Sequence, residues 1–230
     1  MFFLRKNVTC SLTYENIPLS TPLEDLSFIV FDTETTGFQV SATDRIIEIG
    51  AVPVKGFQVQ EKDLFQTYVN PKRQISREIR ELTSISDELV KDAPQALEAI
   101  LSFFDYVESR EAVCLVGHYV GFDALAIKSE FKREKLALKN FLTIDTLDLI
   151  GFIAPSYDMR DLERYAMAFG TRIYDRHSAV GDALTTAYLY VELLFQFQQR
   201  GHKTWGGLIK ATDRNEIPIL MTVVGMLVSG

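Results

Sequence analysis

Cysteine is scarce in this chain of 230 residues: Cys10 and Cys114 are the only two, and they lack the spacing of metal ligands. Two isolated cysteines argue against a disulfide framework and suit a reducing compartment, so we expect a cytoplasmic protein. Long apolar runs are missing as well. Residues 1–6 are too short for the apolar part of a signal peptide, and residues 217–228 are too short for a membrane span, which needs about 20 residues. The sequence therefore predicts no membrane partner.

An excess of positive charge is also missing. The 24 Lys and Arg residues are outnumbered by 31 Asp and Glu residues, which gives a net charge of −7. This balance excludes a protein that coats nucleic acid by bulk electrostatics, although an enzyme that binds a few terminal nucleotides remains compatible with it. The remaining composition is ordinary for a folded domain, because hydrophobic residues make up 47% of the chain and charged residues 24%.

The pattern of apolar residues predicts an α/β fold. Three strand candidates with short connections, which favour antiparallel pairing, come first, and alternating helices and strands follow. We expect a mixed sheet with helices on both faces, formed by residues 27–201 between an N-terminal extension (1–26) and a C-terminal extension of unknown role (202–230). The predicted strands are 27–31, 46–54, 64–69, 112–116 and 141–144, the predicted helices are 94–107, 122–136, 162–169 and 179–199, and 217–228 is a strand or docking segment.

Two acids, Asp32 and Glu34, directly follow the first predicted strand. Side chains two apart on a strand point to one side, so these carboxylates should converge. Converging carboxylates repel one another unless a cation lies between them, and hard oxygen ligands suit Mg²⁺ or Mn²⁺ rather than zinc. A surface turn is the alternative interpretation, because Asp, Thr and Gly are common in turns.

Two further acids open helices. Asp123 follows the predicted strand 112–116, and Asp182 lies in the first turns of the last long helix. Each has a simpler explanation, since the helix dipole stabilises acids at helix N-termini. If His177 shared a helix with Asp182, five residue steps would separate them by roughly 140°. Ser178 is a good N-cap, so we expect the helix to begin there and to leave His177 on the preceding segment, free to face the same site as Asp182.

Together these motifs resemble the DEDDh exonucleases. Asp32-x-Glu34-Thr-Thr-Gly, Phe122-Asp123 and His177-x-Ala179-x-x-Asp182 occur in the order and approximate spacing of this DnaQ-like family, which includes the proofreading subunit of the bacterial replicative polymerase. The resemblance covers about residues 27–200 and implies a ribonuclease H-like fold. One departure is Tyr119, where the family usually has Asn, and it puts the geometry around the acids and the substrate preference in doubt.

The resemblance implies 3′–5′ exonuclease activity through two divalent ions, Mg²⁺ or Mn²⁺, about 3.5–4 Å apart. Asp32 would bridge both ions, Glu34 and Asp182 would complete one, and Asp123 would hold the other. His177 would take the proton from the attacking water, a task that suits an imidazole. The product would be a nucleoside 5′-monophosphate from the 3′ end of single-stranded or frayed DNA, with RNA as an alternative substrate.

The family pattern also implies contacts to the terminal nucleotide. Thr35 and Thr36 would meet its sugar, and Phe38 and Leu82 would wedge against the terminal bases. A stripe of lysines after Asp123 steps by four, three and four residues, so we expect it along one helix face, either binding the nucleic-acid backbone or simply solvated. The stripe comprises Lys128, Lys132, Lys135 and Lys139, of which Lys128 and Lys132 are the candidate substrate contacts.

Two alternatives to a DNA exonuclease remain open at this stage. The chain could be a non-catalytic module that binds nucleic acid or a polymerase subunit on the same fold, or it could be an exoribonuclease. Retention of all four acids and of His177 favours an active enzyme, because a decayed site would be expected to lose at least one of them. A DNA polymerase subunit is a further candidate partner.

Overall fold

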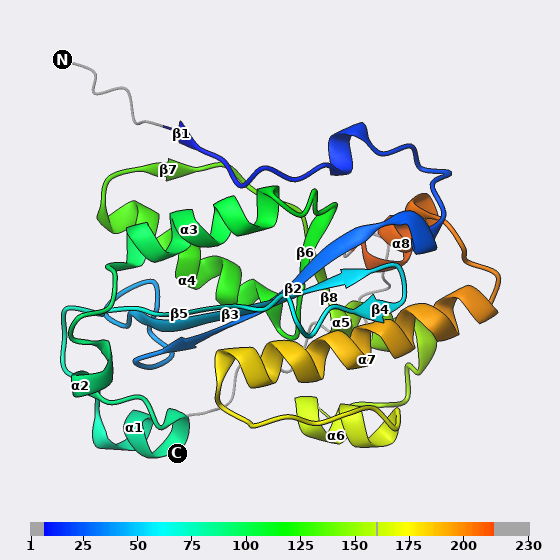
Figure 1. The fold of residues 1–230 in the computed structure, drawn as a ribbon. Helices are drawn as coiled ribbons and strands as arrows, with labels where there is room; N and C mark the ends of the chain where they lie inside the picture. Colours follow the sequence, from blue (N-terminus) through cyan, green and yellow to red (C-terminus); the bar gives the residue numbers. More distant parts are fainter. Residues whose placement is uncertain (1–6, 160, 214–230) are drawn as a thin grey trace.

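The structure is a computed structural model that describes residues 7–159 and 161–213. Its centre is a mixed sheet in which the strands lie in the order β4-β3-β2-β6-β8, with β5 also paired to β3 (Figure 1). β2 is antiparallel to β3, and β3 to β5, whereas β2, β6 and β8 run parallel. The strands are β2 (Ser27–Thr35), β3 (Ile46–Lys55), β4 (Gln58–Val59), β5 (Phe65–Tyr68), β6 (Cys114–Gly117) and β8 (Thr143–Asp145).

This topology confirms the predicted fold class of antiparallel strands followed by parallel strands. The main difference is the length of β2, which was expected to end at Phe31 but continues to Thr35. Pairing with β3 holds the extra residues, since Asp32 lies opposite Gly50 and Glu34 opposite Glu48, and the register shifts only between Glu34 and Thr35. The two acids therefore lie on the strand itself and not in a turn after it.

Helices cover both faces of the sheet (Figure 1). Ile29 and Phe31 of β2 pack on one face with α3 and α4, whereas Phe28 and Val30 pack on the other with the remaining large helices. Within the described residues, no helix combines the length and apolar character that crossing a membrane requires. The helices are α3 (Ala96–Glu108) and α4 (Val120–Arg133) on the first face, and α5 (Thr146–Ile153), α6 (Leu162–Ala168), α7 (Ala179–Gln199) and α8 (Trp205–Thr212) on the second.

Two short helices follow β5, and the first of them forms one rim of the site described below. α1 (Arg77–Thr83) is capped by the Ser76 hydroxyl, and α2 (Asp87–Val90) is capped by the Ser86 hydroxyl. Ile79 of α1 and Val90 of α2 pack with Ile75, which precedes α1, in a small cluster against Ile47 of β3.

The two ends of the described chain pack together against the main core. Backbone bonds join Leu23 to Lys203, Trp205 to Thr21 and Gly206 to Leu19. Trp205 and Leu208 of α8 are buried in the same core as the sheet. The core therefore extends beyond residue 201, the predicted end of the main unit. The N-terminal segment contributes β1 (Asn7–Val8), which pairs with β7 (Ala137–Leu138), and the short helices η1 (Tyr14–Asn16) and η2 (Leu23–Asp25). The predicted segment 217–228 lies outside the described residues.

Candidate active site

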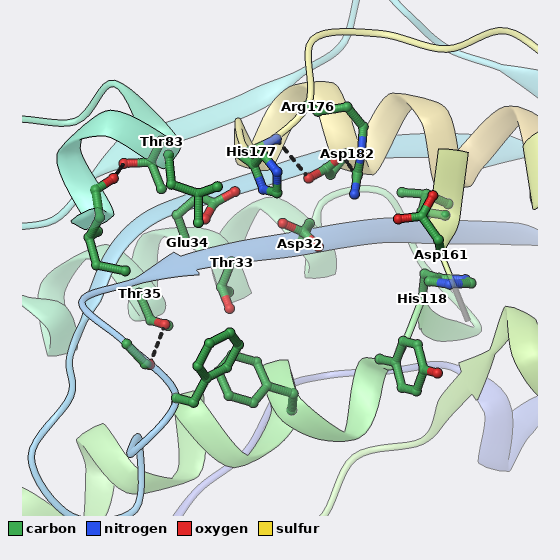
Figure 2. Close-up of a pocket in the computed structure, with 17 residues that line it drawn as sticks. Asp32, Thr33, Glu34, Thr35, Thr83, His118, Asp161, Arg176, His177 and Asp182 are labelled. Carbon is green, nitrogen blue, oxygen red and sulfur yellow. Dashed lines mark hydrogen bonds and ion pairs between the residues drawn. The ribbon is translucent and has the colours of Figure 1, made fainter. Parts of the chain in front are cut away.

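The acids of β2 point toward α7. Because side chains alternate along a strand, Asp32 and Glu34 share the face of Phe28 and Val30, which is the face that α7 covers. Figure 2 shows both carboxylates on the side of His177 and Asp182, with Thr33 on the opposite side of the strand. The predicted convergence of the two carboxylates on one side is thus present in the structure.

The N-terminus of α7 lies directly on β3. A Cβ on Gly50 would meet the carbonyl carbon of Ala179 at 2.3 Å, so only glycine permits this approach. The buried Glu48 side chain then accepts a hydrogen bond from the Ala179 N–H at 2.9 Å. This carboxylate satisfies one of the N–H groups that a helix start leaves without a partner. The close approach brings Asp182 and His177 to the acids of β2.

His177 lies outside the helix, as its sequence context predicts. α7 begins at Ala179 with Ser178 as N-cap, although the Ser178 hydroxyl makes no capping bond. His177 itself has a φ of 59°, in the left-handed region that non-glycine residues seldom adopt. One ring nitrogen of His177 and one carboxylate oxygen each of Glu34 and Asp182 all lie within 4.8 Å of one another. The strained backbone therefore holds the imidazole against two of the predicted acids.

Asp123 reaches the site from the other face of the sheet. It lies in the first turn of α4, is 4% exposed, and its Oδ1 accepts bonds from the Thr33 N–H at 3.0 Å and the Thr33 hydroxyl at 2.6 Å. Tyr119, the N-cap of α4, has a left-handed backbone with φ 56° and ψ 35°. Asn adopts that region more readily than an aromatic residue, which gives a physical reason for the Asn that the family usually has there.

Burial raises the pKa of all four carboxyl groups, and neighbouring acids add to the shift at Asp32 and Glu34. The pKa of Asp32 is raised well above its ordinary value by burial and by the nearby Asp123, Asp182 and Glu34. Burial, Asp182 and Glu48 raise the pKa of Glu34 to about 8. Burial raises the pKa of Asp123 to about 7 against the opposing bonds from Thr33. The site thus holds more carboxylate than its surroundings neutralise.

Arg176 partly compensates this charge. Its guanidinium donates to Oδ1 of Asp182, while the His177 N–H donates to Oδ2 at 3.1 Å. Burial still raises the pKa of Asp182, although Arg176 opposes the shift. No hydrogen bond reaches the carboxylates of Asp32 or Glu34 from any described residue.

These residues fit a divalent cation. The available donors are carboxylate oxygens and one imidazole nitrogen, and hard oxygen donors suit small hard cations. A cation among them would also remove the cause of the raised pKa values, because it favours the ionised carboxylates. Among the described residues, Glu34, His177 and Asp182 form a group of three whose ligand atoms are already close enough together to share one ion.

A pocket of about 320 Å³ opens above the acids. Of the predicted nucleotide contacts, Thr35, Phe38 and Leu82 line it, and Phe38 is 88% exposed. Thr36 does not line it, because the hydroxyl of this buried residue donates to Asp44 at 3.0 Å. The structure therefore brings most, but not all, of the predicted contacts to one opening.

The expectation that four lysines share one helix face is wrong. Lys128 and Lys132 lie on α4, but the helix ends at Arg133, so Lys135 and Lys139 lie beyond it. Lys135 has a φ of 57°, which breaks the helical path. None of these lysines is among the described residues that line the pocket, and the Lys128 ammonium instead lies 5.9 Å from the centre of the Phe141 ring. A substrate role for Lys128 and Lys132 stays a prediction.

Sequence reasoning missed several residues of the site. Arg176 stands beside His177 in the sequence, and its partner Asp182 is only six residues away. Glu48 is the lone acid of a buried strand, and its partner Ala179 is brought to it by the tertiary packing. His118 lines the pocket and bonds to the Thr146 hydroxyl at 2.7 Å through Nδ1. Burial lowers the pKa of His118 to about 4, so this imidazole is neutral at physiological pH. Asp161, the N-cap of α6, lines the same pocket.

Comparison with known proteins identifies the class. The family model described as exonuclease (RNase_T) matches residues 29–190, a span that contains all four acids and His177. The chain therefore belongs to the exonuclease family, and within it to the DnaQ-like 3′–5′ exonucleases, which are hydrolases that generally use divalent metal ions.

Similar sequences and structures agree with this class. The chain is 36% identical over 209 residues to a DNA polymerase III PolC-type of Caldanaerobacter subterraneus subsp. tengcongensis and 34% identical over 181 residues to that of Bacillus subtilis. These matches cover 89% and 78% of this chain, which spans only 14% and 12% of the two relatives.

Two solved structures share the fold. One, titled as exonuclease X in complex with 5′ overhanging duplex DNA, has a TM-score of 0.60 at 21% identity, covering 80% of this chain and 99% of that one. The other, the nuclease domain of 3′hExo, a DEDDh family member, bound to rAMP, has a TM-score of 0.65 at 19% identity, covering 76% and 92%. Both likenesses confirm the ribonuclease H-like architecture.

Proposed function

We propose that this chain removes nucleoside 5′-monophosphates from the 3′ ends of single-stranded or frayed DNA. The observation that carries the proposal is that Asp32, Glu34, Asp182 and His177 line one open pocket, while the buried Asp123 lies close enough to Asp32 to raise its pKa. The catalytic unit spans residues 27–201, which contain each proposed site residue. A non-catalytic module would have no need to keep carboxylates whose mutual repulsion destabilises the metal-free fold.

The four acids would hold two Mg²⁺ or Mn²⁺ ions. Asp32 would bind both, Glu34 and Asp182 would complete one site, and Asp123 would serve the other. When bound, such ions stabilise the charge that develops on the attacking and leaving oxygens of phosphodiester hydrolysis.

The side chains supply the remaining functions. His177 would accept the proton of the attacking water, since its ring lies against Glu34 and Asp182 at the edge of the pocket. Thr35 would contact the terminal sugar, and the buried Thr36 would lie behind Thr35. The exposed side chains of Phe38 and Leu82 would pack on the terminal bases. Lys128 and Lys132 would attract the more distant phosphates.

DNA is the proposed substrate because similar sequences are named as DNA polymerase III PolC-type. The same names support a role in proofreading or repair and a polymerase partner. Both cysteines are free and buried, which supports the further proposal that the protein works in the reducing cytoplasm.

The test is degradation of a 5′-labelled single-stranded oligonucleotide with Mg²⁺ or Mn²⁺, compared with EDTA and with matched RNA. Wild type should shorten DNA one nucleotide at a time from its 3′ end, and Asp32→Asn should be inactive while remaining folded. Asp92→Asn, the same change at an exposed acid, is the control and should keep full activity. Equal turnover by folded Asp32→Asn would refute the assignment, and faster loss of RNA would make the chain an exoribonuclease.

A further inference from the structure

Arg176 places a permanent positive charge inside the acidic pocket. Among the described residues that line this pocket, it is the only Lys or Arg. Its side chain is 25% exposed, although long cationic side chains usually keep their charged heads in water. It comes from the connection between α6 and α7 and immediately precedes His177. We therefore expect this guanidinium to act in binding at the site.

The guanidinium occupies an oxygen that a metal ligand would need. Arg176 donates to Oδ1 of Asp182, and the other oxygen already accepts the His177 N–H at 3.1 Å. Asp182 is therefore bonded on both oxygens within the protein. A divalent ion that binds Asp182 through Oδ1 has to displace the guanidinium, because two cations at one carboxylate oxygen repel each other.

The displaced side chain would remain in the pocket. Figure 2 shows the Arg176 side chain directed into the space between Asp182 and Asp161, which lie on different walls. Its donors therefore face the open pocket, where they are available to a phosphodiester group. Arginine suits such a group, since its planar donors match phosphate oxygens in pairs.

We propose that Arg176 is a resident cation of the active site that exchanges partners during binding. It neutralises Asp182 while no metal is bound, leaves this carboxylate when a divalent ion binds, and then binds a phosphate of the substrate strand. This inference rests on the proposed metal-dependent function and assigns to it a residue that sets both metal affinity and phosphate binding.

The first measurement is Mn²⁺ affinity, followed by electron paramagnetic resonance of the free ion. Arg176→Gln removes the competing charge and should bind Mn²⁺ about tenfold more tightly than wild type. Arg176→Lys keeps the charge and should stay within about threefold of wild type. The matched control is Arg172→Gln on the same connection, because Arg172 pairs with Glu61 away from the pocket and should leave the affinity unchanged.

The second measurement is binding of thymidine 5′-monophosphate at saturating Mn²⁺ by calorimetry. Arg176→Gln should weaken it about tenfold, whereas Arg172→Gln should not change it. Circular dichroism checks that each variant is folded. Mn²⁺ binding by Arg176→Gln that is no tighter than wild type, or unchanged nucleotide affinity, overturns the proposal. Absence of any Mn²⁺ binding to wild type would instead overturn the proposed metal dependence itself.

Discussion

At the scale of single residues, the closely spaced carboxylates of the site repel one another, and a bound cation would relieve this repulsion. Asp32 and Glu34 lie on one strand face, Asp182 faces them from α7, and Glu48 lies opposite Glu34 in the sheet register. Arg176 offsets part of this charge at Asp182. The remaining carboxylates favour their protonated forms, so the metal-free fold should respond to pH.

Replacement of Glu34 tests this repulsion. The folded pKa of Glu34 is about 8, above the ordinary value, so the folded state binds more protons than the unfolded state between about pH 4.3 and 8. Stability in EDTA should therefore fall as pH rises through this window. Glu34→Gln cannot ionise and should exceed wild type at pH 8 by about 1–3 kcal/mol, allowing for solvent screening, and should match it near pH 4.

Urea unfolding at the two pH values measures the effect, and Glu98→Gln on the exposed side of α3 is the control. Wild-type stability that does not decrease between pH 5 and pH 8 would show that the carboxylates do not repel as the structure implies.

The His177 imidazole can be separated from its backbone. His177→Asn is the suitable change, because Asn tolerates the left-handed φ of 59° and keeps the N–H that bonds to Asp182. Loss of a general base should lower kcat by roughly 10²–10⁴-fold. Mn²⁺ affinity should stay near the wild-type value, whereas a large loss of affinity would make His177 a metal ligand instead. Single-turnover hydrolysis and Mn²⁺ titration distinguish the two.

At the scale of elements, much of the site follows from local rules. The two-residue period of β2 predicts that Asp32 and Glu34 face one side, and the N-cap at Ser178 predicts the helix start that leaves His177 outside. The prediction that four lysines share one helix face is wrong in part because nothing in the local pattern marks the end of α4 at Arg133. The pairing of Glu48 with Ala179 could not be predicted, because tertiary packing joins these two distant segments. Arg176 and Asp182 are only six residues apart, but their pairing depends on the irregular backbone before α7, which no regular period describes.

The position of α7 depends on the absence of a side chain in β3. Gly50→Ala would place a Cβ 2.3 Å from backbone atoms of Ala179 and Val180, so the helix start must move away from the sheet. We expect a loss of stability of about 1–3 kcal/mol and a large loss of kcat, because His177 and Asp182 move with the helix. Thermal unfolding and the oligonucleotide assay measure both effects.

Gly151→Ala in α5 is the control for this change. Its added Cβ meets no atom within 4 Å, so helix propensity should raise stability by about 0.5–1 kcal/mol and leave turnover unaltered. If Gly50→Ala behaves like Gly151→Ala, the close approach of α7 to β3 does not set the site geometry.

At the scale of the whole molecule, the fold includes more than the exonuclease motif. Residues 19–23 and 203–206 hydrogen-bond to each other, and α8 packs into the core under β2. The sequence predicts the end of the main unit at residue 201 because its last long helix is expected to end near Gly201, and α7 does end at Gln199. The core contacts of α8 come from the buried Trp205 and Leu208, with Ile209 and Ala211 partly buried against the same core.

Trp205 should therefore be a major contributor to stability. It is 2% exposed, and its ring centre lies 6.5 Å from that of Phe28 on β2. Trp205→Ala removes a large buried side chain and should lower the free energy of unfolding by about 3–5 kcal/mol. Phe195→Ala, which truncates a 46% exposed aromatic on α7, should cost less than about 1 kcal/mol. Urea unfolding gives both values.

The same variant separates stability from catalysis. Trp205 does not line the active-site pocket, so Trp205→Ala should keep wild-type kcat at temperatures where it remains folded. The lost stability should appear as thermal inactivation at a lower temperature than in wild type, because the folded population falls while the acids and His177 keep their positions. A Trp205→Ala protein as stable as wild type would mean that α8 lies outside the cooperative core. A folded variant with strongly reduced kcat would mean instead that the packing under β2 controls the geometry of Asp32 and Glu34.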